Sequence, residues 1–275
     1  MMPLRLRSLR SHGIQLPQGR HARITAVWYD DEDWVVRYLS ATGQQEAYLV
    51  PAPLLDVDER YQLSVSPETT PELFRHDAYA IFGENTHGSV PTEISRKEEC
   101  AVLRWYGLPA YWGGSGLWGD AFYPSDLVAA GVERSASSVM VDLEEARVFA
   151  ARDVIHDTVA CPDGAYGSVD DLLVDLESWA VKYLIVRALP GYRGPEHEQA
   201  GRTSRHACEE GSVEPGVWDE ALISPFWGRW NRASDQLRVP FTRATIWAGP
   251  AYKPDALAPK DECVLARYYG FARNW

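Results

Sequence analysis

Short runs in which hydrophobic and polar residues alternate recur along the chain, and they predict β-strands. In Asp30–Leu39, every second residue from Trp34 to Tyr38 would lie on one face of an extended strand, with Arg37 on the other. Asp175–Leu184 repeats this design after a second acidic turn. Many short strands separated by closely spaced turns are typical of a small barrel or sandwich.

A helix is predicted after each group of strands. Ser95 and Glu98 have the spacing of a capping box, and Gly107 stands where this helix would stop. In the second group, Pro259 suits a first helical turn and Gly270 would end the helix. The predicted fold is therefore mainly β with short helices: two small β-barrels in tandem, each followed by a short C-terminal helix.

The chain contains these elements twice, in the same order. Lys97–Trp112 and Lys260–Trp275 are identical at seven of sixteen positions, and Tyr48–Pro51 matches Leu222–Pro225. A period this long indicates domain duplication rather than a solenoid. The sequence predicts a first domain, a Gly- and aromatic-rich connecting segment, and a second domain with a polar insertion: residues 1–112, 113–150 and 151–275, with the insertion at about 188–220.

Composition restricts the classes of partner. The chain has 275 residues and a formal net charge of −12, which disfavours direct binding to nucleic acid. Its apolar runs are shorter than the ~20 residues of a membrane span, so no integral membrane segment is expected. The N-terminus lacks the apolar core of a signal peptide, and four scattered cysteines suggest a reducing compartment. We expect a cytoplasmic protein.

Three segments of the second repeat resemble the PRC-barrel family, which is named after the cytoplasmic domain of the photosynthetic reaction-centre H subunit. They are "DGAYGSVDDLLVDLESWAVKYL" at Asp163–Leu184, "LISP" at Leu222–Pro225 and "RYYG" at Arg267–Gly270. The first repeat departs from the pattern, because Gln18-Gly19 stands where the family has Asp-Gly. The resemblance implies a tandem PRC-barrel protein of bacterial type.

The resemblance also implies a function. Members of the family are generally non-catalytic and act in protein interaction or assembly, so we expect a protein partner and no cofactor. One alternative is a subunit similar to the reaction-centre H subunit, at the cytoplasmic face of a membrane electron-transfer complex and recruited through a partner. Another is a ribosome or RNA-processing adaptor that binds a basic protein.

Candidate catalytic and metal-binding residues are few. The acidic turns Asp30–Asp33 and Asp175–Glu177 bring carboxylates together, as acid–base catalysis requires. We expect them to be solvated turn residues, because an exposed turn provides no burial to shift a pKa. In the insertion, His197, His206 and Cys208 do not have the spacing of a recognised ligand set. No catalytic residue or metal site is therefore predicted, and a metal-dependent enzyme using these three residues is the least favoured alternative.

Several aromatic residues are candidates for partner contacts. "YWGGSGLWGD", at Tyr111–Asp120, lacks the preceding strand and the following Lys-Ser/Thr helix start of a phosphate-binding loop, so a linker with docked aromatic residues is predicted. Aromatic residues are favoured in interface hot spots, although extra core packing is the alternative. The predicted contacts are Tyr111, Trp112, Trp118, Trp227, Trp230 and Trp247.

Overall fold

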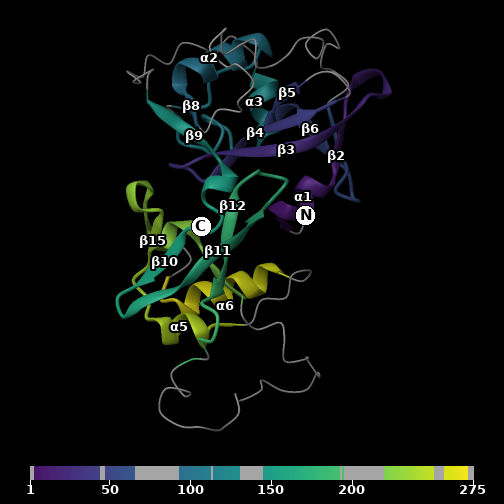
Figure 1. The fold of residues 1–275 in the computed structure, drawn as a ribbon. Coiled ribbons are helices and arrows are strands. Elements are labelled where there is room, and N and C mark those ends of the chain that lie inside the picture. Colours follow the sequence, from purple (N-terminus) through teal and green to yellow (C-terminus); the bar gives the residue numbers. More distant parts are fainter. Residues whose placement is uncertain are drawn as a thin grey trace. The chain divides into compact units, whose positions relative to one another are not determined.

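The computed structural model divides the chain into two compact units (Figure 1). Unit 1 contains Pro3–Asp153 and Val174–Val181, and unit 2 contains Val154–Leu173 and Lys182–Trp275. Most of the predicted polar insertion, with His197, His206 and Cys208, lies outside the described residues. The structure describes residues 3–43, 47–65, 93–112, 114–130, 145–192, 194, 220–250 and 257–271.

Unit 1 is built on a curled sheet in which the strands follow the order β5-β4-β3-β2-β7-β6. Neighbouring strands are antiparallel except β2 and β7, which are parallel. A further strand, β9, pairs with both β3 and β8. The strands of this sheet are β2 (Gly13–Gln15), β3 (His21–Asp30), β4 (Val35–Thr42), β5 (Ala47–Pro51), β6 (Leu55–Val57), β7 (Leu63–Val65), β8 (Glu93–Ser95) and β9 (Ala146–Ala150), and the two-residue strand β1 (Leu4–Arg5) lies outside it.

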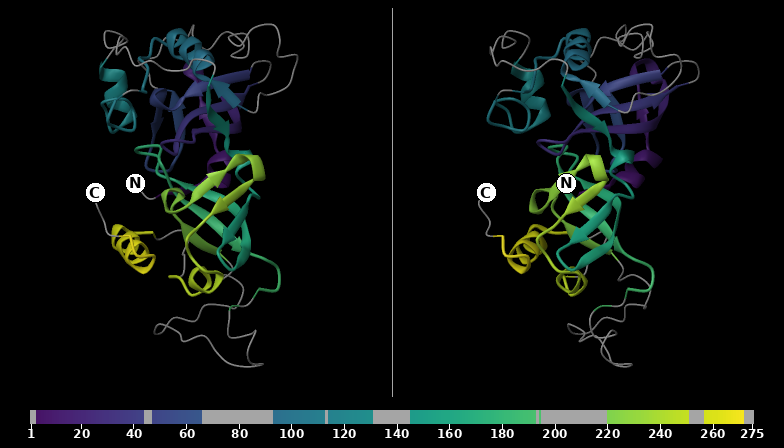
Figure 2. Two further views of the ribbon diagram at one scale, coloured as in Figure 1. Left: turned by 90° about the vertical axis from the view of Figure 1, so that its left-hand side faces the viewer. Right: turned by 60° about the vertical axis from the view of Figure 1, so that its left-hand side comes forward.

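The strands of unit 2 are coloured teal to yellow-green in Figure 2. They form a sheet with the corresponding order β13-β12-β11-β10-β15-β14. Its parallel pair, β10 with β15, stands where unit 1 has β2 with β7. The repeated sequence pattern therefore corresponds to a repeated strand order. The strands are β10 (Thr158–Cys161), β11 (Gly164–Val174), β12 (Val181–Ala188), β13 (Glu220–Ile223), β14 (Arg229–Asn231) and β15 (Gln236–Arg238).

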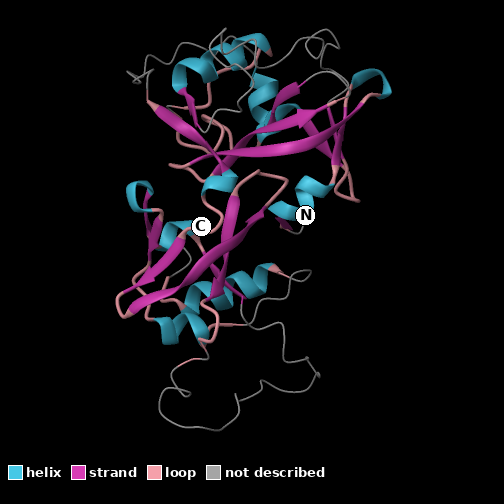
Figure 3. Cartoon of the chain, viewed as in Figure 1, coloured by secondary structure: helices cyan, strands magenta, loops and turns pink. Residues whose placement is uncertain are grey.

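Helices are few and short, so the prediction of a mainly β fold is confirmed (Figure 3). The capping box before α2 is also confirmed: the Glu98 side chain accepts the Ser95 N–H at 2.7 Å, and the Ser95 hydroxyl accepts the Glu98 N–H at 3.3 Å. Gly107, with φ of 67°, follows the end of α2. The helices are α1 (Leu6–Ser11), α2 (Arg96–Trp105), α3 (Pro124–Ala130), α5 (Arg243–Trp247) and α6 (Pro259–Tyr268), with 3-10 turns η1 (Pro17–Gly19), η2 (Ala52–Leu54), η6 (Ala151–Asp153), η7 (Pro225–Trp227) and η8 (Arg232–Ser234).

The core of unit 1 covers both faces of β4. Every residue from Val35 to Ala41 is buried, including Arg37, which is 1% exposed. Alternation places Arg37 on the face opposite to Val36 and Tyr38, and burial of all these residues shows that both faces of the strand are covered. Alternation assumes that one face of the strand meets water, whereas other parts of unit 1 pack against the second face of β4.

Both copies of the acidic hairpin turn contain a left-handed tryptophan at the equivalent position. Trp34 and Trp179 have left-handed φ values of 53° and 62°, and both are buried. Asp30 Oδ1 accepts the N–H of the residue two positions later at 2.9 Å, and Asp175 Oδ1 does the same at 3.0 Å. Backbone hydrogen bonds join the two turns within unit 1. The Val36 N–H donates to the Trp179 carbonyl at 2.8 Å, and the Val181 N–H donates to the Trp34 carbonyl at 2.7 Å.

The capping box supports a stability prediction. We expect Ser95→Ala to lower the free energy of unfolding by about 1 kcal/mol, because the substitution removes the acceptor for an otherwise unpaired N–H of the first helical turn. Urea denaturation followed by circular dichroism measures the change. Ser95→Thr, which keeps a hydroxyl, is the matched control. An equal loss in both variants would contradict a capping role for the hydroxyl.

Candidate functional site: a buried network in unit 1

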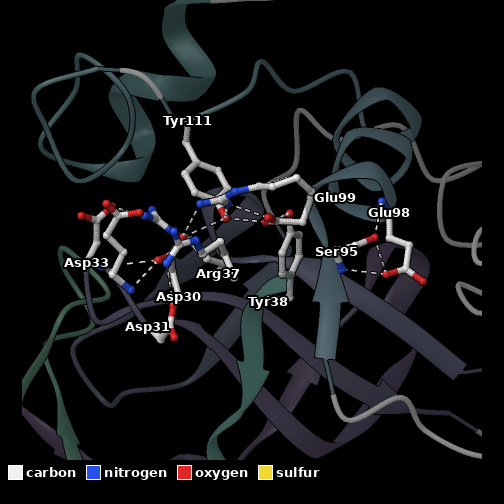
Figure 4. A network of polar contacts seen from close by, with 12 residues as sticks. Asp30, Asp31, Asp33, Arg37, Tyr38, Ser95, Glu98, Glu99 and Tyr111 are labelled. Atoms are coloured by element: carbon white, nitrogen blue, oxygen red, sulfur yellow. Dashed lines mark hydrogen bonds and ion pairs between the residues drawn. The ribbon is translucent and has the colours of Figure 1, made fainter. Parts of the chain in front are cut away.

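Charged and aromatic side chains from three parts of unit 1 meet in a buried network (Figure 4). They come from the region of the β3–β4 turn, from the first turn of α2 and from the segment that follows α2. Asp30 and Glu99 are 0% exposed. Because a buried charge is costly unless a partner compensates it, the contacts inside the network control the stability of unit 1. Its members are Asp30, Asp33, Arg37, Tyr38, Arg96, Glu99 and Tyr111.

Local structure brings these residues together. Asp30 is the last residue of β3, and its carboxylate accepts backbone N–H groups of the turn. Arg96 is the first residue of α2 and Glu99 lies one turn later, so the two side chains share a face of the helix. The capping box fixes the start of α2 and therefore the position of both side chains.

The guanidinium of Arg96 is central to the network. Its Nη2 donates to Asp30 Oδ2 at 3.1 Å, and its Nη1 donates to Glu99 Oε2 at 2.6 Å. The same Nη1 lies 2.8 Å from the Tyr111 hydroxyl. One arginine therefore compensates two fully buried carboxylates that come from different elements.

Glu99 accepts hydrogen bonds from two phenols. The Tyr111 hydroxyl donates to Glu99 Oε1, and the Tyr38 hydroxyl donates to the same oxygen at 3.0 Å. Burial raises the pKa of Glu99, although Arg96 opposes this shift. Burial, reinforced by the charge of Glu99, raises the pKa of Tyr38 and of Tyr111 well above 10.0. The phenols are therefore donors throughout the neutral pH range.

Arg37 connects the network to the segment after α2. Its Nη2 donates to Asp33 Oδ2 at 2.9 Å and its Nη1 donates to the Leu117 carbonyl at 2.5 Å. Its Cζ lies 3.7 Å from the ring centroid of Tyr111 and 4.6 Å from that of Trp118. Desolvated cation–π contacts of this kind stabilise by about 2 kcal/mol.

The segment 114–119, here called the glycine strap, forms a turn beside Arg37. Trp118 is 1% exposed, pairs with Ala121 in an isolated β-bridge, and donates its indole N–H to the Ser178 carbonyl at 3.0 Å. A Cβ atom at Gly114 would come within 2.1 Å of the Gly119 carbonyl carbon. Glycine therefore permits the close backbone approach in this strap.

The structure places three of the six predicted contact residues around this network. Tyr111 and Trp118 are buried in it, with ring centroids 6.0 Å apart. Trp112 lies next to Tyr111, and the Cζ atom of Arg96 is 4.9 Å from its ring centroid. Their role in binding a partner stays a prediction.

The other three lie in unit 2. Trp227 stacks on Phe271 with ring centroids 5.1 Å apart, and Trp247 meets Tyr192 edge to face at 5.5 Å. Trp230 is half-buried on β14. These three residues therefore belong to a different unit from the group around Tyr111. Their contact with a partner also stays a prediction.

One expectation about the acidic turns is wrong, and two members of the network were not predicted. Asp30 is not solvated, because Arg96 and Arg37 cover it. Sequence reasoning also missed the roles of Arg96 and Glu99. Comparison of the repeats indicates a special position for Arg96, because Pro259 stands there in the second repeat, but it does not single out Glu99.

Unit 2 contains a simpler version of the network. Lys182 aligns with Arg37 and Glu262 aligns with Glu99, and these two side chains form a half-exposed ion pair at 3.0 Å. The arginine that would bridge two buried carboxylates has no counterpart, because Pro259 occupies its position. The complete set of residues therefore belongs to the first repeat.

No family model matches the sequence, and no curated protein is significantly similar to it. Within the described ranges, no helix is long and apolar enough to cross a membrane. The same residues contain no group of three or more His, Cys, Asp or Glu side chains arranged to hold a metal ion.

The geometry of the network suits positioning better than proton transfer to a substrate. A general base must reach the proton that it abstracts. The carboxylates of Asp30 and Glu99 are fully buried, and both accept hydrogen bonds from Arg96. What the contacts accomplish is to fasten α2 and the glycine strap to the β3–β4 hairpin.

Removal of the Arg37 charge tests this interpretation. We expect Arg37→Met to lower the free energy of unfolding by about 3 kcal/mol, because the substitution removes one of the two cations that compensate the fully buried carboxylate of Asp30. Guanidinium denaturation followed by tryptophan fluorescence measures this loss. The aligned substitution Lys182→Met is the control and should cost less than about 1 kcal/mol, because its ion pair is half-exposed. Similar losses in the two variants would contradict a special role for Arg37.

The raised pKa of Tyr111 predicts a dependence of stability on alkaline pH. Above pH 10 the unfolded chain releases this phenolic proton and the folded chain keeps it, so the free energy of unfolding falls as the pH rises. Tyr111→Phe should make this decline shallower by about 1.4 kcal/mol per pH unit. Urea denaturation of both proteins between pH 9 and about 11.5 measures the slopes. Parallel slopes would mean that Tyr111 ionises equally well in the folded protein.

Proposed function

We propose that the protein is a non-catalytic protein-binding module of the PRC-barrel type, with two barrel-like units in tandem, and that unit 1 binds a basic partner. The observation that carries this proposal is a group of exposed aromatic and acidic residues that directly follows the glycine strap. We call it the acidic aromatic surface; it consists of Asp120, Phe122, Tyr123, Asp126 and Val128.

Buried residues hold the backbone in place on both sides of this surface. Trp118 is buried beside Arg37, and Leu127 of α3 is 5% exposed, while α3 itself packs on η2. Between these two anchors, Phe122 is 58% and Tyr123 is 41% exposed, with ring centroids 5.2 Å apart. Aromatic side chains held on a rigid backbone lose little conformational freedom on binding, which favours their use in interface hot spots.

The charge of the surface indicates the chemistry of the partner. The sequence from Trp105 to Glu133 contains no lysine or arginine. Asp120 and Asp126 are exposed, and neither forms a salt bridge with any residue that the structure describes. Carboxylates beside exposed rings suit lysine or arginine side chains, through ion pairs and cation–π contacts. This favours a basic protein as the partner, as the adaptor hypothesis requires.

Loss of the aromatic pair tests the proposal. We expect the double variant Phe122→Ser/Tyr123→Ser to lose the basic proteins that crosslink to the wild-type protein in cells. Mass spectrometry of crosslinked complexes, purified separately from membrane and soluble fractions, makes the comparison. Leu189→Ser removes a side chain of unit 2 that is 45% exposed, and is the matched control.

The fraction in which the partners occur distinguishes the remaining alternatives. Recovery from the membrane fraction would support a role similar to that of the reaction-centre H subunit, and recovery from the soluble fraction would support an adaptor. Identical sets of partners for the double variant and the wild-type protein would overturn the assignment of the binding surface.

A further inference from the structure

The two repeats contain an equivalent 3-10 turn that differs in exposure. In unit 1, Leu39 of β4 pairs with Val50 of β5, and η2 follows directly after β5. In unit 2, Leu184, which aligns with Leu39, pairs with Ile223 of β13, and η7 follows two residues later. The structural equivalence of η2 and η7 shifts the sequence match of Tyr48–Pro51 with Leu222–Pro225 by one residue.

In unit 1 this turn is fully covered. All three residues of η2 are buried, and helix α3 packs on them. Leu127 of α3 is 5% exposed, whereas Asp126, beside it in the sequence, is exposed. The cover of η2 is therefore a short helix that combines a buried leucine with an exposed carboxylate.

In unit 2 the equivalent turn is partly open. Pro225 is buried and Trp227 packs against Tyr269 and Phe271, but Phe226 is 59% exposed. Phe226 occupies the position that corresponds to the buried Pro53 of η2. A large aromatic side chain is therefore exposed at the position that α3 covers in the first repeat.

Two exposed basic residues lie on the strand pair that follows this turn. Arg229 and Arg238 lie opposite each other on β14 and β15, and both are exposed. Gly228 separates η7 from β14 in the sequence, and a Cβ atom there would lie 2.8 Å from the Arg238 carbonyl oxygen, so the turn and β15 approach each other closely at this point. Neither arginine forms a salt bridge with another described residue of the chain. The charge of this surface is opposite to that of α3, which carries Asp126 and no basic residue.

We propose that this surface of unit 2, formed by Phe226, Arg229 and Arg238, binds a short acidic amphipathic helix of a partner protein. Unit 1 provides the template, because its own α3 covers the equivalent turn. A leucine of the partner helix packs on Phe226, and its carboxylates pair with the two arginines. The inference rests on the proposed function of a protein-binding module, but it concerns a second surface with the opposite charge preference.

A peptide with the sequence of residues 121–130, held helical by a hydrocarbon bridge between positions 125 and 129 so that Asp126 stays free, is a direct probe. We expect saturable binding to the full-length protein in a fluorescence anisotropy titration, with an affinity that falls as salt increases. Phe226→Ser should weaken binding at least tenfold, and so should the double variant Arg229→Glu/Arg238→Glu. A peptide with Leu127→Ser should bind at least tenfold more weakly to the wild-type protein.

Matched controls separate this surface from the rest of the molecule. Val264→Ser removes a side chain of α6 that is 54% exposed and should leave the affinity unchanged. Phe122→Ser/Tyr123→Ser should also bind the peptide normally, so failure of the proposed function at unit 1 does not imply failure here. Absence of saturable binding, or equal binding by the Phe226→Ser protein with an unchanged circular dichroism spectrum, would overturn the inference.

Discussion

The fold of unit 1 depends on the compensation of buried charge around Arg96 and Arg37. Neither arginine can be left unpaired at this depth, because the desolvation of an isolated guanidinium far exceeds the free energy of a typical contact. Asp30 and Glu99 compensate them only if the hairpin, α2 and the glycine strap all take their observed positions. A requirement that three separate segments meet at one point specifies their arrangement more narrowly than apolar packing alone.

The comparison between the repeats shows that the same strand order forms without a buried charge network. Both sheets have the same order, including one parallel pair at the same place. Unit 2 has this strand order although it contains only a half-exposed Lys182–Glu262 pair and has proline at the position of Arg96. The buried network is therefore an addition to a common framework. Because the framework does not need the network, the physical reason for it must be sought in what the network holds, which is the glycine strap.

Local features of the fold could be predicted from the sequence, and the network could not. Capping of α2 by Ser95 and the Asp-based hairpin turns depend on residues within four positions of each other. The Arg96–Asp30 and Tyr111–Asp30 contacts join residues 66 and 81 positions apart. Alternation predicted the face of the strand on which Arg37 lies but not its burial, since a pattern of hydrophobicity does not reveal that aromatic rings cover a charged residue. In the sequence, only the difference between Arg96 and Pro259 at equivalent positions of the two repeats indicated that Arg96 has a special role.

The same reasoning applies to the aromatic residues, whose type does not reveal whether they stabilise the fold or are exposed for binding. Trp118 and Phe122 lie four positions apart in the strap region, yet one is 1% and the other 58% exposed. The difference arises because Trp118 packs over Arg37 and donates its indole proton to Ser178, which fixes the backbone there. Because the backbone is fixed at Trp118, the side chains that follow it, such as Phe122, lie on the surface of the unit. The buried charge of Arg37 thus influences which aromatic residues of this acidic segment are buried and which are exposed.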